Sequence, residues 1–210
     1  MYKSIFFALL FMNGIAALSA QTGKWTIDLG QLPNGKTYSG TVNIARLTKT
    51  YTLDWKTSAG DYSGVGLLVD GHLFAGYGIG TEGYGIVVYR PAGRNSMDGS
   101  WTASGMNGVT STETILGRNG NFTVDGKTAT GEPYSGTLTL QQTGDTYQAQ
   151  WTIGETVYNG IGFMSGDLLV IGYGFGQAFG VVDYQFNKDG AKGRWAMGGG
   201  ETMGIENLGK

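Results

Sequence analysis

Hydrophobic and polar residues alternate along short segments of this chain. Residues 38–44 place Tyr, Gly, Val and Ile at every second position, and residues 50–56 do the same with Tyr51, Leu53 and Trp55. A period of two residues is typical of a β-strand with one buried face. After position 20, no window of eleven or more residues has helical periodicity. The pattern therefore predicts an all-β protein.

Turn-forming dipeptides separate these segments. Asn-Gly and Asp-Gly favour tight β-hairpins because both residues tolerate a positive φ. They occur at residues 34–35, 70–71, 98–99, 107–108, 119–120, 125–126 and 189–190. Their spacing predicts about eight short strands in each half of the chain, as expected of an antiparallel barrel or sandwich.

The strand pattern occurs twice in the sequence. Residues 38–41 (YSGT) recur as residues 134–137, and the aromatic residues and glycines that follow keep their order. The recurring aromatic pairs are Trp55 and Trp151, Tyr62 and Tyr158, Tyr77 and Tyr173, Tyr89 and Tyr184, and Trp101 and Trp195. Such a long ordered match indicates an internal duplication.

The duplication predicts two domains, residues 21–118 and residues 119–210. We expect each to be a small antiparallel up-and-down β-barrel of about eight short strands, the two arranged in tandem. One continuous barrel or sandwich built from both copies is the alternative. The boundary near Asn119-Gly120 is only a turn, so the two units must touch.

Glycine is unusually frequent, with 39 of 210 residues. In residues 62–66 and 76–80 it occupies alternate positions, which places it on one face of a strand. Glycine in a strand indicates a sharp bend or a close approach of another backbone. Such positions let a small barrel close and let aromatic rings lie over bare backbone.

The first twenty residues have the pattern of a secretory signal peptide. Lys3 precedes an almost unbroken apolar stretch over residues 5–18, and Ser19 and Ala20 end the segment with small side chains. The stretch is shorter than the roughly 20 residues that span a bilayer as a helix. We expect export to the periplasm or the extracellular space and no membrane span; an uncleaved anchor is the alternative.

Composition excludes several kinds of site. The absence of Cys excludes disulfides and thiol catalysis, and a net charge of −2 offers no basic surface for nucleic acid. The single histidine, His72, has no second histidine to complete a metal site. Residues 78–83 spell G-x-G-x-x-G, but no helix follows to bind a phosphate. We expect no cofactor and no metal.

Carboxylates are the remaining candidates for catalysis. Asp28 aligns with Asp125, and Glu113 aligns with Glu206 near the ends of the two units. Two carboxylates held about 5–9 Å apart can hydrolyse a glycosidic bond. The alternative interpretation is structural: a turn Asp at the start of each unit and a hydrogen-bonded strand Glu at its end.

The recurring aromatic residues favour binding over catalysis. Flat aromatic faces stack on sugars and on other rings, so we select six of them as candidate ligand-binding residues: Trp55, Tyr77, Trp101, Trp151, Tyr173 and Trp195. The alternative is that they fill the two barrel cores, because an eight-stranded barrel is just wide enough to be filled by side chains.

Two resemblances add to this interpretation. Gly23-Lys24-Trp25 on a first strand resembles the opening of lipocalin and avidin-like barrels, although Phe122 replaces the Trp in the second unit and no biotin-binding residues match. The duplicated pattern as a whole is similar to secreted bacterial two-repeat, glycine-rich β-barrel proteins. Some of these carry fibronectin-binding labels, and that resemblance implies interaction at a surface.

These observations predict an exported, non-enzymatic binding protein. Its partner would be a small ligand, a glycan or another protein, bound through loops or grooves between the units. A secreted carboxylate-dependent carbohydrate hydrolase and a structural envelope or surface protein are the alternatives. Residues without a counterpart in the second unit, namely His72, Glu82, Arg90 and Arg94, would mark a specialised site if they surrounded a cavity.

Overall fold

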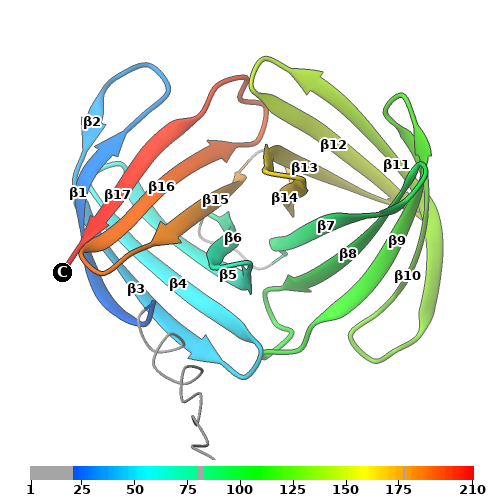
Figure 1. Ribbon diagram of the computed structural model, residues 1–210, viewed down its shortest axis with the longest axis horizontal. Helices are drawn as coiled ribbons and strands as arrows, with labels where there is room; N and C mark the ends of the chain where they lie inside the picture. Colours follow the sequence, from blue (N-terminus) through cyan, green and yellow to red (C-terminus); the bar gives the residue numbers. More distant parts are fainter. Residues whose placement is uncertain (1–20, 80–82, 177) are drawn as a thin grey trace, which may run out of the picture.

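All regular structure in the described residues is β-strand (Figure 1). The computed structural model describes residues 21–79, 83–176 and 178–210, so the predicted signal peptide lies outside the described residues. In these three ranges, no helix is long and apolar enough to cross a membrane. The all-β prediction is confirmed, and the strands form two closed antiparallel barrels of eight strands each.

The first barrel, called barrel A, closes where β17 pairs with β1. The short β2 pairs with β1 and adds to the same sheet. The strands of this sheet, of which all but β2 form the closed barrel A, are β1 (Gly23–Gln31), β2 (Thr37–Tyr38), β3 (Gly40–Leu47), β4 (Thr50–Thr57), β5 (Gly60–Val69), β6 (His72–Gly78), β15 (Phe179–Phe186), β16 (Gly190–Met197) and β17 (Gly204–Gly209).

The second barrel, called barrel B, closes where β14 pairs with β7. Its strands are β7 (Gly85–Gly93), β8 (Ser96–Ala103), β9 (Ser111–Arg118), β10 (Asn121–Lys127), β11 (Pro133–Thr143), β12 (Thr146–Ile153), β13 (Thr156–Ser165) and β14 (Leu168–Gly174). Figure 1 shows the two barrels side by side, with β1 and β9 at opposite ends of the molecule.

The two copies exchange their last three strands, and this corrects the expected division. Residues 21–118 and 119–210 do not each close a barrel of their own, because β7–β9 belong to barrel B and β15–β17 belong to barrel A. Gly78 of β6 lies opposite Phe179 of β15, and Tyr173 of β14 lies opposite Gly85 of β7. Since the copies carry similar strands, β6 finds an equivalent partner in either copy, as in a domain swap.

Three apolar clusters hold the molecule together. One fills barrel A around Trp25, Leu53 and Tyr184, and another fills barrel B around Tyr89 and Leu138. The third lies between the barrels and joins Val65, Leu67, Phe74 and Val181 of barrel A to Ile86, Val88, Ile161 and Phe163 of barrel B. Burial of this seam fixes the barrels against each other.

Glycine permits the closest approach between the barrels. A Cβ at Gly76 on β6 would collide with the backbone of Gly85 on β7, and a Cβ at Gly172 on β14 would collide with that of Gly180 on β15. The two contacts are equivalent in the duplicated sequence. These glycines therefore allow β6 to approach β7 closely, and β14 to approach β15, where the two barrels meet.

The turn predictions are confirmed in part. Asp70-Gly71 and Asn119-Gly120 form tight hairpin turns with positive φ at both residues, 51° and 83° in the first and 54° and 78° in the second. The dipeptides at 98–99 and 125–126 lie inside β8 and β10, so those two predictions are wrong. Each of these glycines instead makes room for a neighbouring ring, that of Tyr89 and Tyr134 respectively.

Candidate functional site

Each barrel contains a cavity lined by three of the six predicted aromatic residues. The cavity of barrel A measures about 200 Å³ and includes Trp55, Tyr77 and Trp195 in its lining. The cavity of barrel B measures about 410 Å³, and its lining includes Trp101, Trp151 and Tyr173. The barrels are thus only partly filled by side chains, and the candidate ligand-binding residues gather inside them rather than in loops.

Strand alternation directs these rings inward. On β4, Tyr51, Leu53 and Trp55 are buried, whereas Asp54 and Lys56 between and beyond them face solvent. Gly64, on the neighbouring β5, leaves the space into which the Trp55 ring packs, since a Cβ there would lie 2.8 Å from that ring. Glycine on one strand and an aromatic residue on the next therefore shape the cavity wall.

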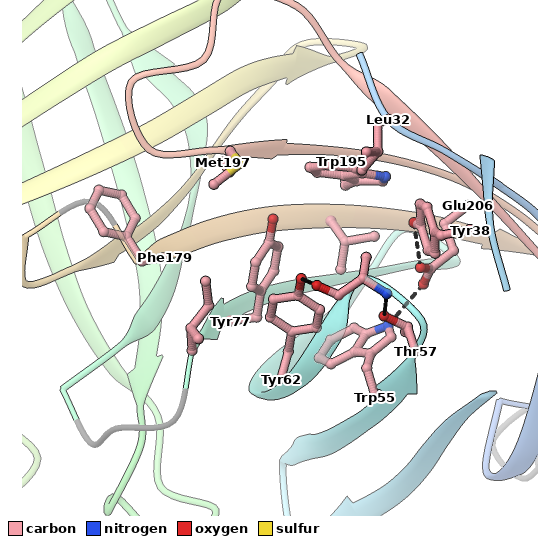
Figure 2. Close-up of a pocket in the computed structure, with 13 residues that line it drawn as sticks. Leu32, Tyr38, Trp55, Thr57, Tyr62, Tyr77, Phe179, Trp195, Met197 and Glu206 are labelled. Atoms are coloured by element: carbon pink, nitrogen blue, oxygen red, sulfur yellow. Dashed lines mark hydrogen bonds between the residues drawn. The ribbon is translucent and has the colours of Figure 1, made fainter. Parts of the chain in front are cut away.

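A buried carboxylate lies in the wall of the barrel A cavity (Figure 2). Glu206 on β17 is 5% exposed. Trp55 Nε1 donates to its Oε1 at 2.8 Å, and the Tyr38 hydroxyl donates to Oε2 at 2.6 Å. The Tyr184 hydroxyl also donates to Oε1. Three neutral donors from β4, β2 and β15 thus hold one carboxylate in place.

Barrel B repeats this arrangement around Glu113 on β9, which is 7% exposed. The Tyr134 hydroxyl donates to Oε2 at 2.6 Å, and the Tyr89 hydroxyl donates to Oε1. Trp151 Nε1 donates to the Tyr89 hydroxyl at 3.3 Å, so in this barrel the indole is linked to the carboxylate only indirectly, through the hydrogen bond of Tyr89. Glu113 accordingly has one protein donor fewer than Glu206.

Strand register shows that the two sites are equivalent. Glu206 lies opposite Gly30 on β1, and Glu113 lies opposite Gly126 on β10. Because of the strand exchange, each site combines both copies: Trp55 and Tyr38 come from the first, and Glu206 comes from the second.

The tyrosines around the carboxylates remain protonated. Burial raises the pKa of Tyr38 and Tyr77, and the negative charge of Glu206 raises both further. Burial likewise raises the pKa of Tyr134 and Tyr173, and the negative charge of Glu113 raises both further. At neutral pH these phenols are therefore hydrogen-bond donors.

A second tryptophan in each cavity wall has an enclosed N–H group. The indole N–H groups of Trp195 and Trp101 are buried without a hydrogen bond of good geometry among the described residues, but each interacts with a tyrosine hydroxyl of the same wall, that of Tyr38 and Tyr134 respectively, and partly offsets the rise in its pKa. The two residues are equivalent, since Trp195 lies opposite Val182 and Trp101 lies opposite Val87. Both N–H groups are therefore part of the protein wall rather than of the cavity surface.

The two cavities differ in their lining. Met197 lies opposite Gly180 in barrel A, and the equivalent residue opposite Gly85 in barrel B is Ala103. The shorter side chain leaves more room and accounts for part of the larger volume of the barrel B cavity. Leu32 of barrel A is likewise replaced by the more polar Thr128.

The described lining of each cavity reaches the surface at one end. In barrel A the lining extends to Ile79 and Met197, both 42% exposed, and in barrel B it extends to Phe175, which is 59% exposed. The other end of barrel A is filled by Trp25 and Phe186, whose rings pack edge to face with centroids 5.3 Å apart. In each barrel, the exposed end of the lining is the one at which β6 or β14 ends.

Sequence reasoning missed part of the site. It did not select Tyr38, Tyr62, Tyr134 or Tyr158, all of which line the cavities. Their recurrence in the duplication was a usable signal, because paired positions that keep an aromatic ring also keep their place in the barrel. Strand burial alone could not separate cavity-lining rings from core rings.

The carboxylates do not form the pair that glycoside hydrolysis requires. Glu113 and Glu206 lie in different barrels, and each is the only carboxylate in the described lining of its cavity. Asp28 and Asp125 are exposed, whereas both glutamates are buried. Among residues 21–79, 83–176 and 178–210, no group of three or more His, Asp or Glu side chains could hold a metal ion.

Of the residues without a counterpart, His72, Arg90 and Arg94 are absent from the described linings of both cavities. His72 Nδ1 lies 2.7 Å from Oδ1 of Asp183, and Oδ2 of the same carboxylate accepts from Ser165 and Arg194 at the seam between the barrels. Arg90 pairs with Asp70 on the surface. Glu82, like Gly80 and Thr81 of the glycine motif, lies outside the described residues. A specialised site in the first copy therefore finds no support in the described residues.

Comparison with family models, with curated proteins and with solved structures finds no match for this chain. The interpretation of its function therefore depends on the geometry of the two cavities.

Proposed function

We propose that this chain is an exported, non-enzymatic binding protein that holds one small ligand inside each barrel. The observation that carries the proposal is the repetition of one cavity, with its aromatic walls and its buried glutamate, in two barrels of different lining. Both cavities keep polar groups that a pure core would not need, because buried polar groups cost free energy unless they are paired.

The size and lining of the cavities favour a ligand of about one ring. Ligand pockets typically measure about 300–1,000 Å³ and carry a few polar groups among apolar walls. Barrel B falls within this range, and barrel A lies below it. We expect the larger cavity to accept larger compounds and the smaller one to exclude them.

Export is part of the same proposal. The signal-peptide pattern of residues 1–20 supports delivery to the periplasm or the extracellular space. Two sites on one molecule would also raise avidity for a target that presents the ligand more than once, because the second binding event becomes intramolecular.

A ligand panel tests the binding proposal. Purified protein is titrated calorimetrically with neutral aromatic compounds, monosaccharides and small organic cations. We expect at least one class to bind with a stoichiometry of two. Met197→Trp should block the barrel A cavity and Ala103→Trp that of barrel B, each leaving one site.

Leu116→Trp is the matched control, because Leu116 is 56% exposed and lies outside both linings. It should leave both sites intact. If no compound of the panel binds, or if both blocking variants bind like the unmodified protein, the proposal fails.

A further inference from the structure

We propose that the ligand of each cavity is a small organic cation, an ammonium compound whose charge sits against the buried glutamate within the aromatic walls. This inference rests on the proposed function and specifies its ligand class. It is carried by the charge of the lining, by the arrangement of the rings and by the capacity of each glutamate to accept further hydrogen bonds.

The charge of the described lining is unbalanced. Within the described linings, Glu206 and Glu113 are each the only carboxylic acid, and neither lining includes Lys, Arg or His. The ion pairs among the described residues involve neither glutamate. Buried charges in proteins are usually paired, so a carboxylate without a cationic partner leaves a place for a cation.

Neither carboxylate uses all of its hydrogen-bond acceptor positions on the described residues. A carboxylate offers about four acceptor positions. Glu206 uses three of them, on Trp55, Tyr184 and Tyr38, and Glu113 uses two, on Tyr89 and Tyr134. In both sites Oε2 accepts from one tyrosine only. A ligand N–H or a positively charged group can therefore still approach that oxygen.

The rings provide the second half of a cation site. Tyr77 packs against Trp55 and Tyr62 in barrel A, with ring centroids 5.9 Å and 5.7 Å apart at steep angles. Tyr173 packs in the same way against Trp151 and Tyr158 in barrel B, at 5.9 Å and 6.4 Å. Rings set at an angle to one another present several faces to one space, and aromatic cages of this kind attract ammonium groups.

The probe must carry the positive charge and fit the smaller cavity, which measures about 200 Å³. Choline is a small ammonium compound and is therefore a suitable probe. The neutral counterpart of the same shape is 3,3-dimethylbutan-1-ol.

The test compares these two probes on the unmodified protein by calorimetric titration. Choline should bind at least ten times more tightly than the neutral alcohol, with a stoichiometry of two. Glu206→Gln and Glu113→Gln should each remove one choline site. Asp189→Asn, which removes one exposed negative charge from the β15–β16 connection, is the control and should keep both.

The outcomes separate this inference from the proposed function. Equal or tighter binding of the neutral alcohol overturns the cation inference and leaves a binding protein. The same holds if neither probe binds but neutral aromatic compounds or monosaccharides do. If no compound of the wider panel binds, both proposals fail. The comparison of probes needs no variant, so a variant that fails to fold does not obscure it.

Discussion

At the scale of single residues, Glu206 and Glu113 organise their surroundings as well as facing the cavities. Each is a buried acceptor on which tyrosine hydroxyls converge. Glu206 also accepts directly from Trp55. Removal of such an acceptor leaves donors buried without partners, which costs more than the loss of an ordinary surface hydrogen bond.

Replacement of Glu206 by Leu should therefore destabilise the protein strongly. We expect a loss of about 3 kcal/mol in the free energy of unfolding, since an unsatisfied buried group costs about 1–3 kcal/mol. Glu206→Gln keeps one acceptor oxygen and should cost less. Urea denaturation measures both. Equal stability of Glu206→Leu and the unmodified protein would show that these hydrogen bonds contribute nothing.

The raised tyrosine pKa values predict a loss of stability at high pH. Tyr38, Tyr77, Tyr134 and Tyr173 keep their protons in the folded protein at a pH where the unfolded chain loses them, above about pH 10. The folded state then binds more protons than the unfolded state, so stability is full below that pH and falls as the pH rises.

Absorbance at 295 nm, recorded during an alkaline titration, measures this effect directly. The tyrosines with raised pKa should ionise only as the protein unfolds, after the exposed ones. Ionisation of all tyrosines in one step near pH 10, with the fold intact, would contradict the described burial.

At the scale of strands, glycine and aromatic residues act as complementary pairs. Gly99 on β8 faces the Tyr89 ring, and Gly193 on β16 faces the Tyr184 ring. The sequence allowed the prediction of strands, of two barrels and of the six candidate rings, because alternation and duplication report them directly. The sequence did not show that Gly99 lies in a strand rather than in a turn. An Asp-Gly dipeptide is compatible with a turn and also with a strand in which a neighbouring ring covers the glycine, and the sequence does not show that the ring of Tyr89 lies there.

Gly99→Ala should therefore destabilise the protein by about 1–3 kcal/mol, the usual cost of overpacking. Gly93→Ala is the matched control, because a Cβ at Gly93, also in a strand, would meet no atom within 4 Å. Thermal or urea unfolding compares the two variants. Equal effects would mean that the ring of Tyr89 does not require glycine beside it.

At the scale of the whole molecule, the exchange of strands makes the two barrels one structural unit. Each barrel takes its final three strands from the other copy, and each cavity takes its glutamate from them. The sequence could not reveal this exchange. The duplicated strands offer nearly the same pairing edges, so pairing within a copy and pairing between copies satisfy the same pattern.

Engineered cysteines can detect the exchange, because the chain has no native cysteine. Gln31 on β1 lies opposite Ile205 on β17, so Gln31→Cys with Ile205→Cys should form a disulfide on oxidation. Thr112 is the residue equivalent to Ile205 in the other copy, since Ser100 pairs with Thr112 as Arg194 pairs with Ile205.

Gln31→Cys with Thr112→Cys should stay reduced, because β1 and β9 lie at opposite ends of the molecule (Figure 1). Peptide mass spectrometry after digestion identifies the bond. A disulfide in the second variant and none in the first would mean that each copy closes its own barrel.

The most direct measurement of the central claim, that ligands bind inside both barrels, is a nuclear magnetic resonance titration of the indole N–H signals. The chain has five tryptophans: Trp55, Trp101, Trp151 and Trp195 line the cavities, and Trp25 packs at the filled end of barrel A. With choline or another compound that binds, the four cavity signals should shift and that of Trp25 should stay in place. Binding that leaves the four signals unchanged would contradict the account.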